Sequence, residues 1–152
     1  MKPQAPRFDA FDADACREIA QDLANHEGPL LPILHALQDR FGYIDQAALP
    51  VIADVLNLSR AEVHGVVTFY HDFRSRPPGR HVVKICRAEA CQALGAQKLF
   101  DEVAAASAEN GAVTVEAVYC LGNCALSPAA LIDGDLHGRL DTTRTLDLVA
   151  GR

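Results

Sequence analysis

The sequence lacks several features that would assign the protein to a large functional class. No window holds the roughly 18 uninterrupted apolar residues of a membrane-spanning helix, and the N-terminal residues show no signal-peptide pattern. We therefore expect a cytoplasmic protein with no membrane span. The net charge is −6 with scattered acidic residues, so the basic patch typical of nucleic-acid-binding proteins is missing as well. No G-x-G-x-x-G fingerprint follows an expected strand, so we expect no nicotinamide dinucleotide to bind this chain.

The first half of the 152-residue chain is predicted to be a small helical bundle. Apolar residues recur at helical spacing in four segments, and Ser59 with Glu62 forms a capping-box pattern before the fourth. The expected helices are residues 12–25, 29–41, 46–56 (capped by Asp45) and 60–70. A polar segment around Pro77, Pro78 and Gly79 follows, and we interpret it as a linker between two subdomains. This half shows no nucleophile–base pair and no metal-ligand spacing, so we interpret residues 1–75 as a packing or docking domain.

The second half, residues 76–152, alternates β-rich and helical patterns. The expected elements are strands at 81–86, 113–119, 129–132 and 136–140, a loop at 87–92, and helices at 94–109 and from Thr142 or Thr143 onward. A strand–helix–strand connection makes the first two strands parallel by the right-handed crossover rule. The predicted fold class is therefore α+β: a small N-terminal helical bundle followed by an α/β domain close to the thioredoxin plan.

Four of the five cysteines stand in two pairs. Four residues separate Cys86 from Cys91, three separate Cys120 from Cys124, and 28 lie between the pairs. Each pair follows an expected parallel strand, so we expect both pairs to meet at one end of the sheet. In a reducing compartment, spaced cysteines favour metal binding over structural disulfides. Cys16 lies in the first expected helix and is interpreted as a small residue, buried or semi-exposed.

A [2Fe–2S] cluster is the interpretation that this spacing favours, because it needs four thiolates, two for each iron. The two loops are wider than the two-residue loops common in structural zinc sites. A structural zinc module held by the same four cysteines, acting in protein interactions, remains an alternative, as do reversible disulfides. The absence of a C-x-x-C motif argues against thioredoxin-type disulfide exchange.

The sequence resembles the thioredoxin-like [2Fe–2S] subunit of respiratory complex I and of its soluble relatives. The resemblance runs from about Leu30 to Leu148 and rests on LLPILHALQDRFGYID, LPVIADVLNLSRAEVHGVVTFYHDF, VKICRAEACQALGA and VEAVYCLGNCALSPAALIDG. It implies one [2Fe–2S] cluster and no catalytic residue on this chain. The ligands that it implies are Cys86, Cys91, Cys120 and Cys124.

The resemblance also implies partners. They are a subunit that binds FMN, NAD and further iron–sulfur clusters and, through it, a catalytic subunit. This chain would then be an electron-transfer subunit of an NAD(H)-dependent oxidoreductase, with no active site of its own. Its shortness within the family favours the gamma subunit of an NAD-dependent, molybdenum-containing formate dehydrogenase, with complex I and NAD-linked hydrogenases as alternatives. A free-standing ferredoxin is a further alternative, against which the helical bundle argues.

Overall fold

The structure is a computed structural model that describes residues 8–108 and 111–152. The chain divides into two compact units between Pro77 and Pro78, and each unit is described by itself below. No helix within the described ranges is long and apolar enough to cross a bilayer.

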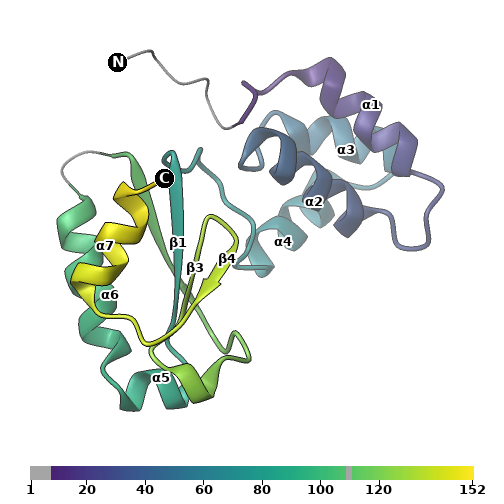
Figure 1. Cartoon of the computed structure of the whole chain (residues 1–152). Coiled ribbons are helices and arrows are strands. Elements are labelled where there is room, and N and C mark those ends of the chain that lie inside the picture. The colour runs from purple at the N-terminus through teal and green to yellow at the C-terminus, as the bar shows by residue number, and fades with distance from the viewer. Residues whose placement is uncertain (1–7, 109–110) are drawn as a thin grey trace, which may run out of the picture. The chain divides into compact units, whose positions relative to one another are not determined.

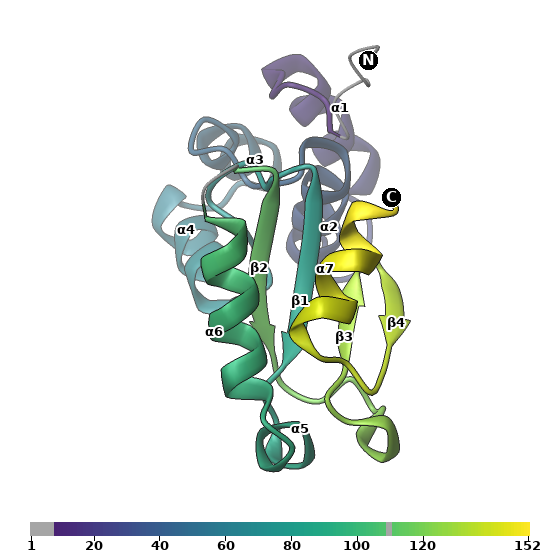
Figure 2. The same ribbon diagram turned by 60° about the vertical axis from the view of Figure 1, so that its left-hand side comes forward.

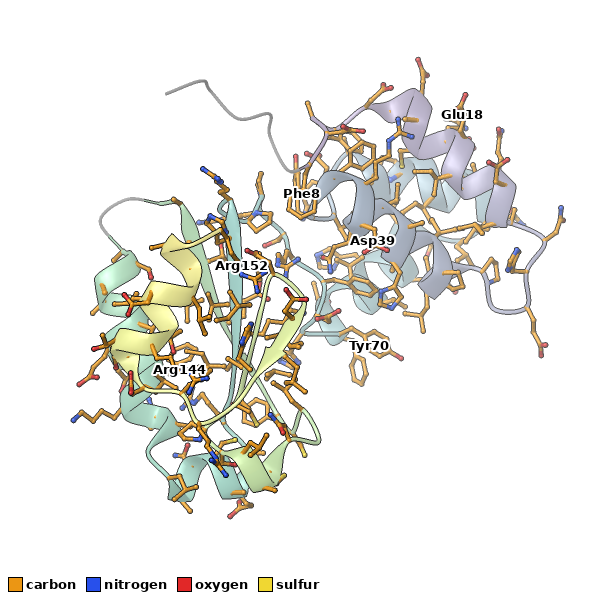
Figure 3. All side chains as sticks on the ribbon, in the orientation of Figure 1. Phe8, Glu18, Asp39, Tyr70, Arg144 and Arg152 are labelled. Carbon is orange, nitrogen blue, oxygen red and sulfur yellow. The ribbon has the colours of Figure 1, made fainter. Side chains whose placement is uncertain are left out.

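Four helices build the first unit, as their apolar spacing predicts (Figure 1). They are α1 (Ala13–Leu23), α2 (Leu30–Phe41), α3 (Ala48–Leu56) and α4 (Arg60–Phe69). Their apolar faces enclose one core, in which Ile33, Leu34 and Ile52 are fully buried. Charged side chains lie on the outer faces, and Glu18 projects from the outer side of α1 (Figure 3). The unit is therefore held together by apolar packing between amphipathic helices.

Local side-chain chemistry sets the ends of these helices. The capping box is present: the Glu62 N–H donates to Ser59 Oγ at 3.2 Å, and the Ser59 N–H donates to Glu62 Oε2 at 2.8 Å. The third helix begins at Ala48, so the prediction that Asp45 caps a helix starting at residue 46 is wrong. The Asp45 carboxylate instead accepts the Ala47 N–H at 2.8 Å and closes a turn just before the helix.

The second unit is built on a four-stranded mixed sheet in the order β2-β1-β3-β4. The strands are β1 (His81–Cys86), β2 (Val113–Val118), β3 (Ala130–Ile132) and β4 (Asp135–His137). β1 and β2 are parallel, whereas β3 runs antiparallel to both β1 and β4. Helices α6 (Ala96–Ser107) and α7 (Thr142–Ala150) lie side by side on one face of the sheet (Figures 1 and 2). The α+β fold class and the parallel pairing of the first two strands are confirmed.

The segment after β1 differs from the prediction. Residues 89–93 form a short helix, α5 (Glu89–Ala93), where the sequence suggests a loop. The long helix begins at Ala96 rather than at residue 94, because Gly95 with φ of 89° separates the two helices. A left-handed backbone of this kind is tolerated best by glycine, so Gly95 ends one helix and lets the next begin at a new angle.

The C-terminal segment differs in two details. The fourth strand spans residues 135–137 rather than 136–140, and Asp133 and Gly134, both with positive φ, form the two-residue turn before it. The last helix is capped by Asp141, whose carboxylate accepts the Arg144 N–H at 2.7 Å. The prediction that Thr142 or Thr143 supplies this cap is therefore wrong.

Candidate metal centre

Both cysteine pairs lie at one end of the sheet. β1 ends at Cys86, which lies opposite Val118, the last residue of β2. α5 carries Cys91 and follows β1, whereas Cys120 lies in the loop after β2 and Cys124, further along that loop, opens the short 3-10 helix η1 (Cys124–Leu126). Figure 2 shows α5 and this loop at the same end of the parallel strands. The parallel pairing thus brings residues remote in sequence to one place.

The thiols form two pairs that differ in exposure. Cys86 and Cys91, the inner pair, are each 2% exposed. Cys120 and Cys124, the outer pair, are exposed, and their sulfurs lie 3.9 Å apart. Two thiolates on one tetrahedral ion, at a bond length of about 2.3 Å, stand about 3.8 Å apart. The outer pair therefore already has the spacing of two ligands to one ion.

Hydrogen-bond donors converge on the sulfur of Cys86. Burial raises the pKa of its thiol, but hydrogen bonds from the Ala88 N–H, the Cys91 side chain and the N–H groups of Leu121 and Cys120 outweigh burial and lower it. Cys120 has φ of 67°, in the left-handed region. Backbone of this kind points successive N–H groups at one site and forms an anion-binding nest. The inner end of the site is thus built to stabilise a thiolate.

The charges of all three other cysteines act on the thiol of Cys124. Its hydrogen bond with Cys120 raises the pKa of the Cys124 thiol, and the charge of Cys120, burial and the charges of Cys91 and Cys86 raise it further. Four thiolates at this range repel one another, and a bound cationic centre relieves the repulsion. The donor set therefore fits a metal centre that takes four thiolates.

The layout of the cysteines as two pairs is the ligand pattern of a two-iron cluster. A structural zinc ion needs four ligands around one point, whereas a [2Fe–2S] cluster takes two thiolates at each iron. Two pairs of cysteines match the second requirement.

Cys16 belongs to the first unit, whereas the four paired cysteines belong to the second. It is fully buried in the helical core of the first unit, as predicted. Burial raises the pKa of the Cys16 thiol to about 11, and the charge of Arg17 offsets part of this rise. Cys16 is therefore a protonated, unreactive thiol near neutral pH.

Two further residues support the cysteine loops, and sequence reasoning missed both. Ser127 is buried, with Oγ 3.2 Å from Cys91 Sγ and 2.8 Å from the Cys124 carbonyl oxygen. Gly138 lies against the loop that carries the outer pair. A serine before a proline and a glycine after a short strand are common in loops, so no signal in the sequence marks either one as part of the site.

Replacing Gly138 by alanine is expected to disturb the outer pair. A Cβ at this position would lie 2.6 Å from Leu126 Cβ and 2.7 Å from the Leu126 carbonyl oxygen, too close for a backbone that cannot yield. The loop from Asn123 to Leu126 must then move, and Cys124 moves with it. We expect a loss of about 1–3 kcal/mol in the free energy of unfolding and faster loss of bound iron to a chelator. Thermal unfolding and the decay of visible absorption would measure these effects.

Gly65→Ala is the matched control for this prediction. Gly65 lies in α4, and a Cβ there meets no atom within 4 Å. Removing a glycine from a helix interior stabilises it by up to about 1 kcal/mol, and iron retention should not change. Equal iron retention in Gly138→Ala and Gly65→Ala would show that the close contact at Gly138 does not position the outer pair.

Comparison with known proteins gives consistent matches. A family model described as thioredoxin-like [2Fe–2S] ferredoxin matches residues 16–151. One NADH-quinone oxidoreductase subunit, from Escherichia coli (strain K12), is 32% identical over 149 residues, which cover 90% of this chain and 90% of that protein. The HndA protein of the NADP-reducing hydrogenase of Solidesulfovibrio fructosivorans is 29% identical over 144 residues, covering 88% of this chain and 84% of that protein.

A solved structure matches the fold. It is an NAD+-reducing [NiFe]-hydrogenase in the air-oxidised state, with a TM-score of 0.66 and 27% sequence identity. The match covers 80% of this chain but only 22% of the hydrogenase chain, so the matched part spans about a fifth of that chain's length.

Proposed function

This chain belongs to the thioredoxin-like [2Fe–2S] ferredoxin family, and from this premise we propose that Cys86, Cys91, Cys120 and Cys124 bind its [2Fe–2S] cluster. The observation that carries the proposal is the convergence of these cysteines, as two pairs, at one end of the sheet. When bound, the cluster supplies one-electron chemistry. The protein supplies the thiolates, the N–H groups directed at Cys86, and a buried inner half that excludes water.

We propose that the chain works as an electron-transfer subunit of an NAD(H)-dependent oxidoreductase. Its partner would be a subunit that binds FMN, NAD and further iron–sulfur clusters, and the flavin would exchange hydride with NAD(H). The outer pair supports this division because the exposed sulfurs of Cys120 and Cys124 give electrons a short path out of the protein. Such a chain would work in the cytoplasm, where a reducing environment keeps the thiols free.

The helical unit is proposed to dock on that flavin-bearing partner. An open groove of about 550 Å³ runs along α4, with Leu58, Val66 and Tyr70 in its lining. Phe69 at the end of α4 is 71% exposed, which is unusual for a large apolar side chain. The neighbouring Tyr70 projects outward at the same end (Figure 3). A partner surface that covers this face would bury both aromatic rings.

For the parent complex we propose an NAD-dependent, molybdenum-containing formate dehydrogenase. The support is the resemblance of the chain, from about Leu30 to Leu148, to the soluble relatives of the complex I subunit, which include the gamma subunit of such enzymes. The relatives named above are subunits of an NADH-quinone oxidoreductase and of a hydrogenase, and these complexes are the competing assignments. Purification of the native complex and assay with formate, hydrogen and a quinone would decide: formate-dependent NAD+ reduction supports the proposal, and activity with only another substrate rejects it.

The proposal that the partner carries out hydride chemistry and this chain only transfers electrons is tested with the chain alone and in its complex. The isolated, cluster-loaded chain should not oxidise NADH, whereas the complex with its flavin-bearing partner should oxidise NADH and reduce the cluster. Phe69→Ser should weaken co-purification with the partner and leave the visible spectrum unchanged. NADH oxidation by the isolated chain would refute the assignment of hydride chemistry to the partner. Full partner binding by Phe69→Ser would refute docking through this face.

A further inference from the structure

Ser127 links the two halves of the cysteine site through one hydroxyl group. Its side chain is 8% exposed and lies just after the short 3-10 helix Cys124–Leu126. The hydroxyl donates to the Cys124 carbonyl at 2.8 Å and lies 3.2 Å from the sulfur of Cys91. It thus contacts a ligand of the inner pair and the backbone of a ligand of the outer pair.

The Ser127 hydroxyl has one proton and two neighbouring atoms that could accept it, the Cys91 sulfur and the Cys124 carbonyl oxygen. In the metal-free protein the single proton of a Cys91 thiol can go to Cys86 Sγ or to Ser127 Oγ, and in the second case the serine proton is free for the Cys124 carbonyl. A metal-bound Cys91 is a thiolate with no proton to donate. The contact between Cys91 and Ser127 can then be a hydrogen bond only if the serine donates it.

The Cys124 carbonyl does not depend on the serine hydroxyl. The backbone N–H of Ser127 also donates to this carbonyl, at 3.3 Å. The oxygen therefore keeps a donor when the hydroxyl turns toward the sulfur, and the turn leaves no polar atom of the contact without a partner. A rotation about one side-chain bond is enough to make this change.

We propose that in the cluster-loaded protein Ser127 donates a hydrogen bond to the Cys91 thiolate and so raises the reduction potential of the cluster. A cluster with four thiolates is negatively charged, and reduction adds one more negative charge to it. A donor directed at a ligand sulfur stabilises the more negative state, so it favours reduction. The inference rests on the proposed ligand set, because it requires Cys91 to be a ligand.

Burial strengthens the effect of this hydrogen bond. Cys91 is 2% exposed and Ser127 8% exposed, so bulk water has little access to this contact. A hydrogen bond in such a site is stronger than in water, and removing its donor leaves the sulfur without a substitute. Cys120 and Cys124 are exposed and can accept hydrogen bonds from water, so a single donor matters less there.

The test is redox titration of the loaded chain followed by its visible and EPR spectra. Ser127→Ala should shift the ratio of reduced to oxidised cluster at a fixed potential about tenfold toward the oxidised form. For a one-electron couple this equals a potential lower by about 59 mV. Ser127→Thr keeps the hydroxyl and should titrate close to the wild type. Exchange into D2O should shift the iron–sulfur vibrational bands less in Ser127→Ala than in the wild type.

Ser107→Ala is the matched control. Ser107 is a buried serine in the last turn of α6, and within the described part of the chain its hydroxyl has no hydrogen-bond partner. Losing this hydroxyl should leave the potential and the isotope shift unchanged. Ser127→Gly removes the same hydroxyl as Ser127→Ala with a smaller side chain, and it carries the test if the alanine variant does not load.

The outcomes separate this inference from the ligand proposal. A Ser127→Ala protein with an intact cluster, the wild-type potential and the wild-type isotope shift would overturn the role of Ser127 alone. Failure of both the alanine and glycine variants to hold a cluster that Ser127→Thr holds would also overturn it, because the hydroxyl would then serve assembly. A wild-type chain that holds no [2Fe–2S] cluster would overturn both proposals.

Discussion

Replacing Cys86 or Cys120 by serine is expected to abolish most of the cluster. Cys86 is a buried anchor of the site and the sulfur on which the backbone N–H groups converge, whereas Cys120 is half of the exposed pair. Serine offers a hydroxyl of much higher pKa in place of a thiolate, so one iron loses a ligand. Iron and acid-labile sulfide per chain, with the visible absorption, should fall several-fold in either variant.

Cys16→Ala is the control for the cysteine variants. Cys16 is fully buried in the helical core, and its thiol has a pKa raised to about 11 by burial, so it is neither charged nor accessible. Its replacement should cost some stability but leave iron and sulfide content at the wild-type level. An equal loss of cluster in Cys16→Ala would contradict the ligand assignment, as would a Cys86→Ser protein with full iron content and an unchanged spectrum.

Replacing Ile33 by alanine is expected to destabilise the helical unit strongly without removing the cluster. Ile33 is fully buried between the helices, so its truncation leaves a cavity as well as losing buried apolar area. Such changes cost about 2–5 kcal/mol, a large share of the stability of a unit this small. Far-UV circular dichroism should show earlier unfolding of helix, while the visible spectrum reports the cluster separately.

The exposed residue Asp39 on the same helix provides the matched control. Asp39→Ala should change the free energy of unfolding by no more than about 0.5 kcal/mol, because no buried contact is lost. We expect Ile33→Ala to keep its cluster because all four proposed ligands lie in the second unit. If Ile33→Ala lost iron as completely as Cys86→Ser, the two units would not be independent and the proposed separation of docking from cluster binding would fail.

The elements predicted best are those with strong local patterns. The apolar stripe of α2 and the capping box at Ser59 and Glu62 can each be read within one short segment, and both are present. The parallel pairing of β1 and β2 is also predictable. A helix between two strands carries the chain back to the end where the first strand began, so the second strand runs in the same direction. From that pairing alone the cysteine loops can be expected at one end of the sheet.

The errors occur where local signals are short or where several residues compete for one role. The sequence predicts a loop in place of α5 because five residues are too few to show helical periodicity. At the last helix, Asp141, Thr142 and Thr143 could each supply the N-cap. Asp141 supplies it, because the helix already begins at Thr142. Ser127 cannot be found from sequence, since its contact with Cys91 joins two loops that only the folded sheet brings together.

The central claim is that these four cysteines hold a [2Fe–2S] cluster, and one measurement tests it most directly. Visible absorption and EPR spectra of the purified chain would be recorded anaerobically, before and after reduction with dithionite, alongside iron, zinc and sulfide analysis. A brown protein that is EPR-silent when oxidised and gives an S = 1/2 signal when reduced is the predicted result. A colourless, EPR-silent protein that contains zinc, even after anaerobic reconstitution with iron and sulfide, would contradict it.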